Sequence, residues 1–203
     1  MLLKRQLTSH RVKILLEQLR EARSTVAVDK LREIEPLLQR IFARINPHPS
    51  FRVVRFATDV VRGKGRLNTK ILDQSEDISS ESPEAVLSSS QLNALAVSIF
   101  LSFNLSLPNL PLDAALLDDP IQSLDDINLL GLVDLLRRTK DRRQVIVSTH
   151  DARFGRLLSR KLRPANSSQK TNVIELRGWN RTGPEVEQYS IQPDEIPLRL
   201  AVV

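Results

Sequence analysis

Four carboxylates crowd the end of one short apolar stretch in this chain of 203 residues. In ALLDDPIQSLDD, residues 115–126, Asp118 and Asp119 follow three apolar residues, and Asp125 and Asp126 come after a proline. Adjacent carboxylates repel one another, and burying an unpaired carboxylate costs free energy. We therefore expect a metal ion or a protein cation to face this group of acids.

Asp118 and Asp119 suit two different tasks if the apolar stretch before them is a strand. The carboxyl end of a strand in an α/β sheet opens into the crevice where ligands bind. One carboxylate there can hold Mg²⁺, directly or through water, and the next can orient and deprotonate an attacking water. The pattern favours Asp118 as the metal ligand and Asp119 as the base, with acids that are only solvated at a strand end as the alternative.

Two other short motifs combine residue types that bind anions. LSSSQ, residues 87–91, stands where a loop enters a helix, and small hydroxyl residues at a helix start leave backbone N–H groups aimed outward. An ordinary serine N-cap is the other interpretation of this motif. STHD, residues 148–151, ends a second apolar strand; its His150 can donate a hydrogen bond to a phosphate, although a lone histidine is more often structural.

The stretches that must position these motifs alternate between strand and helix, which is typical of an α/β fold with a mostly parallel sheet. A turn around residues 63–65 joins the first two strands, and the polar residues 73–84 predict a loop. Strands are expected at 51–56, 66–73, 144–149, 173–177 and in the stretch ending at Asp118, and helices at 92–100, 124–139 and 151–162.

The first 45 residues predict a long helix that leads into this lobe. Its apolar residues recur at alternating spacings of three and four, as in a coiled coil; they are Leu31, Ile34, Leu38, Ile41 and Ile45. The β-branched stretch STVAV at 24–28 interrupts this rhythm, and a single helix lying on a domain is the alternative. We therefore divide the chain into a helical or coiled-coil segment, 1–45, and a lobe, 46–203.

Charge is sharply partitioned along the chain, although the net charge is only +6. Residues 1–70 hold sixteen Lys and Arg against six Asp and Glu, whereas residues 71–136 hold eleven acids and no Lys or Arg. Basic flanks indicate a polyanion partner such as double-stranded DNA, and solvated basic helices are the alternative. No cysteine is present and no apolar stretch is long enough to cross a bilayer, so we expect a cytoplasmic protein without a membrane partner.

Taken together, the order and spacing of the motifs resemble the C-terminal half of an SMC/SbcC-type ABC ATPase head, a family associated with DNA. The signature motif is similar to residues 87–91, and the Walker B strand with its catalytic carboxylate is similar to residues 116–120. The D-loop is similar to residues 123–125, and the switch histidine to His150. The resemblance covers roughly residues 30–180 and implies the C-terminal lobe of a P-loop ATPase head.

The resemblance implies ATP and Mg²⁺ as cofactors and a dimer of heads, identical or different, that engages around them. Asp118 would hold Mg²⁺, Asp119 would be the general base, and His150 would contact the γ-phosphate. The signature residues would contact a nucleotide held on the opposing head; they are Ser88, Ser89, Ser90 and Gln91. The D-loop residues Ser123, Leu124 and Asp125 would line the interface between heads. Repair, chromosome organisation and defence against foreign DNA all use such heads, in the cytoplasm and often associated with the nucleoid.

The sequence departs from the family in one large respect and two small ones. No GxxxxGK(S/T) loop occurs, since RGKGRLNTK at 62–70 has the wrong spacing. We therefore expect no ATP hydrolysis by this chain alone, and we expect a Walker A-bearing N-terminal half, in another chain or a missing segment, to complete it. Ser89 and Ser90 stand where glycines are usual, and Asp119 stands where glutamate is common.

A chain that is half of a head should expose an apolar sheet face and a strand edge, and should self-associate without its partner. Two other functions remain open at this point. One is a non-catalytic accessory chain or truncated remnant with the same fold, which the absent phosphate loop favours. The other is a metal-dependent nuclease that uses the four carboxylates; these are Asp118, Asp119, Asp125 and Asp126.

Overall fold

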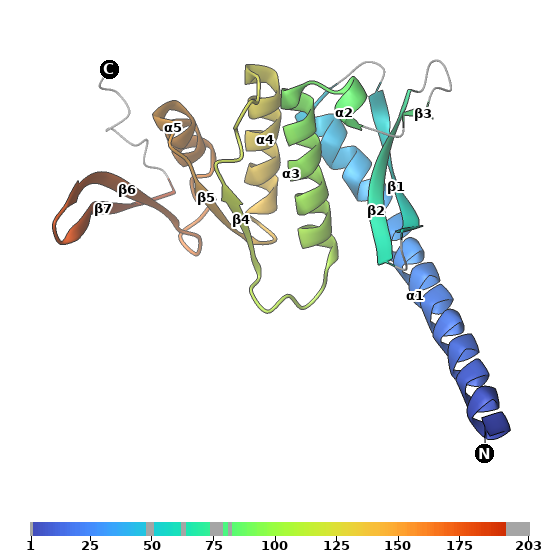
Figure 1. The fold of residues 1–203 in the computed structure, drawn as a ribbon. Helices are drawn as coiled ribbons and strands as arrows, with labels where there is room; N and C mark the ends of the chain where they lie inside the picture. Colours follow the sequence, from blue (N-terminus) through green and yellow to red (C-terminus); the bar gives the residue numbers. More distant parts are fainter. Residues whose placement is uncertain (1, 48–50, 62–63, 74–78, 81–82, 194–203) are drawn as a thin grey trace.

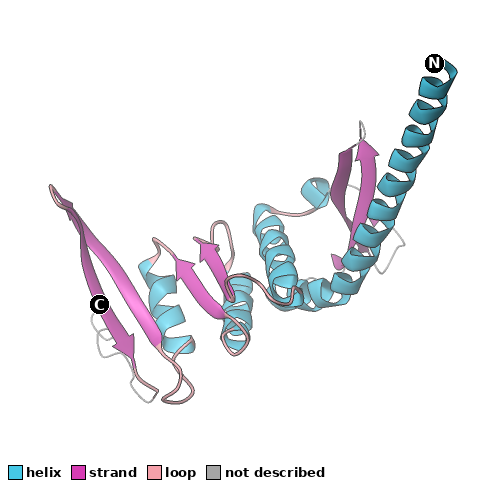
Figure 2. Ribbon diagram, turned by 90° about the horizontal axis from the view of Figure 1, so that it is seen from below, coloured by secondary structure: helices cyan, strands magenta, loops and turns pink. Residues whose placement is uncertain are grey.

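The computed structural model describes residues 2–47, 51–61, 64–73, 79–80 and 83–193. Along this part of the chain an elongated arrangement of helices and small sheets runs from a long N-terminal helix to a C-terminal hairpin (Figures 1 and 2). The element order is α1 (Leu2–Ile45), β1 (Phe51–Val61), β2 (Lys64–Asp73), β3 (Ser79–Ser80), α2 (Pro83–Val86), α3 (Ser89–Ser106), β4 (Ala114–Asp118), α4 (Asp126–Thr139), β5 (Gln144–Ser148), α5 (Ala152–Lys161), β6 (Thr171–Asn180) and β7 (Gly183–Ile191).

Helix α1 is continuous over Leu2–Ile45, so the long helix predicted from the sequence is confirmed. The interrupted rhythm at 24–28 does not break it: the Thr25 hydroxyl donates to the Glu21 carbonyl oxygen at 3.0 Å. Side chains of residues 10–26 are exposed, whereas Leu38 and Phe42 in the last turns are fully buried. Only the second half of α1 therefore belongs to the core, where it packs against α3, α4 and β1.

Strands β1 and β2 form an antiparallel ladder that the short β3 extends, which confirms the two strands predicted there. The centre of the predicted turn, residues 62–63, lies outside the described residues, as do positions 74–78 and 81–82 of the predicted polar loop. Val54 and Ile71 pair across the ladder and are fully buried, so this sheet adds an apolar face to the core.

Strands β4 and β5 are the elements that position the candidate site. They pair in parallel, with Ala114 opposite Gln144 and Asp118 opposite Ser148, and α4 makes the connection between them. This crossover is the unit that alternating strand and helix patterns predict. Because both strands end at the same edge, the motifs that follow them are brought together there.

The prediction of a mostly parallel sheet is not confirmed: among the described strands, β4 and β5 are the parallel pair, and the other two sheets are antiparallel. The strand predicted at 173–177 exists as β6, but it folds back on β7 as a hairpin. A tight turn explains this pairing, because Gly183 adopts φ +127°, which disfavours residues with a side chain.

Helices α1 and α4 pack unusually close together at one point of the core. A Cβ atom at Gly131 on α4 would lie 2.4 Å from the Arg44 carbonyl oxygen, so only glycine fits there. Leu132 and Leu136 beside it are fully buried together with Leu101 of α3. No described helix is long and apolar enough to cross a membrane.

An ion pair adds to the contact between α1 and α4. Arg44 donates from Nε and Nη2 to Asp134 Oδ2 at 2.8 and 2.5 Å, and Arg137 donates to Oδ1 at 3.1 Å. The hydrogen bond from Arg44, helped by the one from Arg137, lowers the pKa of Asp134 from 3.8 to about 2. A carboxylate with a depressed pKa in the folded state stabilises the fold above its unfolded pKa.

Asp134→Asn is therefore expected to lower the free energy of unfolding at pH 7 by about 1 kcal/mol. The full pKa shift corresponds to more, but a third of the side chain is exposed to solvent, which screens the pair. The difference from wild type should shrink as the pH falls from about 4 toward 2, because the wild-type carboxylate is then protonated too. Urea denaturation at pH 7, 5 and 3 measures it, and Asp126→Asn, on the exposed first turn of α4, is the control. A difference that stays constant with pH contradicts the prediction.

Candidate functional site

Asp118 and Ser148 end the two parallel strands side by side, and the Ser148 hydroxyl donates a hydrogen bond to Asp118 Oδ1. Both residues are exposed at this edge. The pair presents a carboxylate and a hydroxyl oxygen, the ligand type that Mg²⁺ prefers. Within the described residues no group of three or more His, Cys, Asp or Glu could hold a metal ion. The residues thus fit an ion that takes one or two protein oxygens and fills its other positions with water or phosphate.

Asp119 occupies a backbone conformation that residues with a side chain seldom adopt, with φ +43°. Aspartate tolerates it better than most residues, and the Asp119 N–H donates to the Ser148 carbonyl oxygen at 2.9 Å. The chain therefore turns sharply as it leaves β4. As a result the Asp119 side chain is aimed at the end of β5, not along the strand direction.

The Asp119 carboxylate lies between two residues that follow β5. Thr149 Oγ1 donates to Oδ1 at 3.2 Å, and His150 Nδ1 lies 2.9 Å from Oδ2. The Asp119 side chain is only 26% exposed, whereas the His150 ring is 82% exposed. Because Nδ1 faces the carboxylate, the other ring nitrogen of His150 is left to meet a ligand. Sequence reasoning brought Asp119 and His150 to one site but missed Thr149.

The turn that carries Thr149 and His150 is fixed by the start of α5. Asp151 caps this helix by accepting from the Phe154 N–H at 2.8 Å, and this bond is the main reason that its pKa lies below the usual value. The Asp151 N–H in turn donates to Thr149 Oγ1 at 3.1 Å. The Thr149 hydroxyl thus accepts from Asp151 and donates its hydrogen to Asp119.

The signature-like motif forms the start of α3 and a complete capping box. Ser88 Oγ accepts from the Gln91 N–H at 3.3 Å, and Gln91 Oε1 accepts from the Ser88 N–H at 2.9 Å. A serine hydroxyl that accepts one bond still has a hydrogen to donate. Ser88 can thus both cap the helix and offer a donor to an anion at the helix N-terminus. The exposed Ser89 stands next to it.

Ser90 is turned away from this helix start and toward α4. Its hydroxyl donates to Asp125 Oδ2 at 3.1 Å and accepts from the Asp125 N–H at 3.2 Å and from Asn128 Nδ2 at 2.8 Å. Asp125 is also the N-cap of α4, accepting from the Asn128 N–H. The Ser90 side chain therefore joins the signature-like motif to the D-loop-like motif, and its predicted contact with nucleotide would have to come from its backbone.

Ser90→Ala is expected to lower the free energy of unfolding by roughly 1–3 kcal/mol, because Asn128 is buried and its amide would lose a partner. Ser89→Ala, one residue earlier on the exposed side of the helix, is the matched control and should stay within 0.5 kcal/mol of wild type, as is usual for a surface site. Urea denaturation of the three proteins measures both values. Equal stability of all three would show that the contact contributes nothing.

A second side chain of α3 holds the loop between the two acidic pairs. Asn93 Nδ2 donates to the carbonyl oxygens of Pro120 and Gln122 at 2.9 and 2.7 Å. Ser123 in this loop has φ +66°, and Leu124 packs against the core. The predicted D-loop is thus a tight turn that hydrogen bonds hold to α3. Nothing in the sequence marks Asn93 or Asn128 as part of the site, apart from their positions in the two helices.

The site therefore consists of two clusters at one end of the α/β unit. The first, the carboxylate cluster, contains Asp118, Asp119, Ser148, Thr149 and His150. The second, the serine cluster, contains Ser90, Asp125 and Asn128. The loop at 119–125 joins the two clusters directly. The first cluster can bind a cation and position a water; the second fixes how two helix N-termini are placed beside it.

No protein-family model and no curated protein matches this sequence. Solved structures match its fold. One is a chain from a study of ATP-driven dimerization and DNA-stimulated activation of SMC ATPases, with a TM-score of 0.56 and 17% identity over 84% of this chain and 90% of that one. Another is an Smc head domain with a coiled coil and joint from Pyrococcus yayanosii, with a TM-score of 0.60 and 14% identity over 91% of this chain.

An Smc head domain from Pyrococcus furiosus, bound to the C-terminal domain of ScpA, matches with a TM-score of 0.57 and 15% identity over 89% of this chain. This chain spans 40% of that structure and 32% of the one from Pyrococcus yayanosii. The fold is that of part of an SMC ATPase head, which confirms the family resemblance at the level of fold.

Proposed function

We propose that this chain, which has the fold of part of an SMC ATPase head, supplies the C-terminal half of an SMC/SbcC-like ATPase that acts on DNA. The observation that carries the proposal is the placement of the Asp119 carboxylate between Thr149 and His150, beside Asp118. In this proposal the chain consists of two parts, a helical segment at 1–45 and an ATPase lobe at 46–203. A Walker A-bearing half would bring the loop that cradles the phosphates of ATP, and two such heads would dimerise.

Each residue of the carboxylate cluster has a task in this proposal. Asp119 accepts a proton from the attacking water, and Thr149 holds the carboxylate in place for it. His150 meets the γ-phosphate with the ring nitrogen that does not face Asp119. Asp118 and Ser148 hold Mg²⁺, which when bound offsets the negative charge of the phosphates. The water is thereby oriented by groups that the fold has already fixed.

The signature-like and D-loop-like motifs, which the serine cluster joins, serve the contact between heads. Ser88, Ser89 and Gln91 offer donors at the α3 N-terminus to the nucleotide of the opposing head. Ser123, Leu124 and Asp125 line the interface beside them. Because the Ser90 hydroxyl binds Asp125, both parts of this surface are placed by the same contact.

An uncovered apolar face supports the presence of a completing half. Leu116 on β4 is 54% exposed and Ile146 on β5 is 44% exposed, although both stand in the middle of their strands. Leu176 and Trp179 of the β6–β7 hairpin are exposed as well. Exposed apolar surface of this kind marks a site that another chain or segment covers.

ATP turnover of this chain alone, and after mixing with a Walker A-bearing half of an SMC/SbcC-type head, with and without double-stranded DNA, tests the proposal. Turnover that appears only in the mixture and rises with DNA is expected. Demonstrated association without turnover would favour a non-catalytic accessory chain or remnant of the same fold. Turnover by this chain alone would show that its nucleotide site has been misidentified.

The nuclease alternative is disfavoured by the direction of one carboxylate. Asp125 binds Ser90 and Asn128, and its Oδ1 accepts from the Asn128 N–H. The four acids of the sequence motif therefore do not converge on one metal ion in the described structure. DNA cleavage that needs a divalent metal but no ATP would restore this alternative.

The proposal also includes a location and a role. We propose that the chain works in the cytoplasm, in association with the nucleoid, and that its role is in repair or chromosome maintenance.

A further inference from the structure

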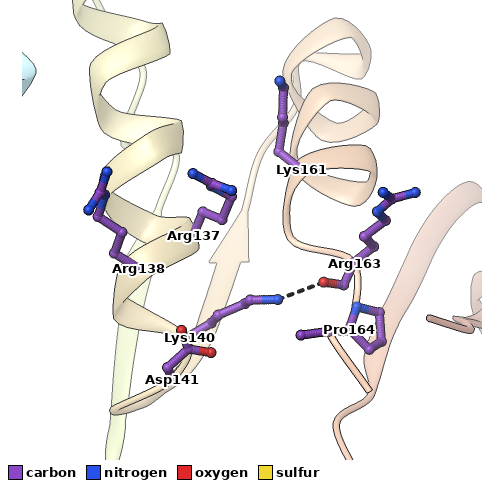
Figure 3. Close-up of a pocket in the computed structure, with 8 residues that line it drawn as sticks. Arg137, Arg138, Lys140, Asp141, Lys161, Arg163 and Pro164 are labelled. Carbon is purple, nitrogen blue, oxygen red and sulfur yellow. Dashed lines mark hydrogen bonds between the residues drawn. The ribbon is translucent and has the colours of Figure 1, made fainter. Parts of the chain in front are cut away.

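An open groove of about 410 Å³ lies between the C-terminal ends of α4 and α5 (Figure 3). Arg137 and Arg138 stand on the α4 side, and Lys161 and Arg163 on the α5 side, with Lys140 reaching between them. Five cationic side chains and one carboxylate line the groove. The lining residues are Arg137, Arg138, Lys140, Asp141, Lys161, Arg163, Pro164 and Ala165.

The groove lies at the opposite end of the α/β unit from the carboxylate cluster. Helix α4 starts just after the loop that leaves β4 and ends just before β5 begins, so it runs against the strand direction. Helix α5 likewise starts two residues after His150 and runs away from the site. A ligand in the groove therefore leaves the proposed nucleotide site free, and the two sites can be tested separately.

The positive charge of the groove is only partly neutralised inside the protein. Asp134 is the acid partner of Arg137 and Arg138, and it is shared with Arg44 of α1. In the part of the chain that the structure describes, neither Lys161 nor Arg163 forms an ion pair. Three arginines on one carboxylate and two unpaired cations leave a surplus of positive charge.

Helix ends alone do not account for this surplus. Cations in the last turn of a helix offset the negative end of its dipole, which explains Arg137 and Arg138 on α4 and Lys161 on α5. Arg163, however, lies beyond Leu162, the C-cap of α5. Its carbonyl oxygen accepts from Lys140 Nζ at 2.6 Å, so the two sides of the groove are joined. This bond holds the Lys140 side chain across the groove, against the backbone of Arg163.

We propose that this groove binds the phosphate backbone of double-stranded DNA, independently of nucleotide. The inference rests on the proposed action on DNA and names where this chain would hold it. Lys140 bonds the backbone carbonyl of Arg163, and Asp134 joins Arg137 to Arg44 on α1. The cations of the groove therefore extend toward α1, and such a row suits a polymer of repeated negative charges. No aromatic side chain lines the groove, so it offers no stacking and no readout of sequence.

Fluorescence anisotropy of a labelled 20-base-pair duplex, with the full chain and without ATP, tests the proposal at roughly 50–200 mM salt. Lys161→Gln/Arg163→Gln is expected to weaken binding about tenfold. The double-logarithmic salt slope should become shallower by about 2, because roughly one counterion is released for each phosphate contact. Lys13→Gln/Arg20→Gln on exposed α1 removes the same charge and should leave the affinity within about twofold of wild type. Thermal melts confirm that each variant is folded.

Equal loss in both variants would overturn the groove assignment, because binding would then follow net charge alone. Unchanged binding by the groove variant would overturn it as well. Competition by poly-glutamate as effective as unlabelled duplex at equal charge would assign the groove to an acidic protein segment instead. Asp119→Asn should bind the duplex as wild type does. If the groove variant loses duplex binding but no partner half activates ATP turnover, the groove assignment stands and the ATPase proposal is refuted. If the mixture turns over ATP but the groove variant binds the duplex as wild type does, the ATPase proposal stands and the groove assignment is refuted.

Discussion

Asp119→Asn in the completed head is expected to lower ATP turnover by about 10²–10⁴-fold, the usual contribution of a general base. The amide keeps the size of the side chain and can still accept from Thr149, but it cannot take a proton from water. Its contact with His150 Nδ1, 2.9 Å in the wild type, also loses its charge. Turnover of the mixture with a Walker A-bearing half measures the effect, at saturating ATP.

The matched control is Asp126→Asn, the same change on an exposed acid seven residues later. It should leave turnover within about twofold of wild type, because Asp126 is exposed and is not a member of the carboxylate cluster. Association with the other half should be the same for both variants, so a loss of turnover reports on chemistry. If Asp119→Asn kept full turnover while Asp118→Asn abolished it, another group would have to be the base.

Gly131→Ala is expected to lower the free energy of unfolding by roughly 1–3 kcal/mol, the cost of overpacking a close contact. The new Cβ would lie 2.4 Å from the Arg44 carbonyl oxygen and 2.9 Å from the Ile45 Cα, both of them backbone atoms of α1. Backbone cannot swing aside as a side chain can, so α1 and α4 must separate. The intrinsic helix preference for alanine, up to about 1 kcal/mol, offsets only part of this cost.

Gly155→Ala in α5 makes the same exchange where there is room. The nearest atom to its Cβ would be the Thr149 Cγ2 at 3.8 Å, an ordinary contact. This variant should be as stable as wild type or more stable, by up to about 1 kcal/mol. Urea denaturation at pH 7 compares the two changes. A stabilised Gly131→Ala would mean that the helices can separate without loss.

The elements that position the site could be predicted from the sequence because each has its own periodicity and end signals. The strand ending at Asp118 and the one predicted at 144–149 are short apolar runs that stop at polar residues, and the structure confirms both as Ala114–Asp118 and Gln144–Ser148. Once these strands are taken as parallel neighbours, the meeting of Asp118 with Ser148 follows. Strand β7 was missed because its residues 183–191 are mostly polar and exposed, so no apolar alternation marks it.

The serine cluster could not be predicted, since it depends on how α3 packs against α4. Ser90 and Asp125 are 35 residues apart, and nothing local requires their contact. From the sequence alone, Ser90 is only a departure from the family, since it stands where glycine is usual. In the structure its hydroxyl makes three hydrogen bonds, two with Asp125 and one with Asn128. The left-handed backbone at Asp119 was also beyond prediction, because φ there is set by the turn that the whole loop makes.

The unbroken helix α1 makes the molecule a lever with a long arm. Its 44 residues measure about 66 Å at 1.5 Å per residue. A tilt of about 5° at the buried end would move the far end by about 4–6 Å. Conversely, a small force on the exposed end of α1 produces a larger force at its buried end. There Arg44 pairs with Asp134, and the α1 backbone packs closely against Gly131. Helix α4, which meets α1 at this contact, has its N-cap at Asp125, in the turn beside the carboxylates.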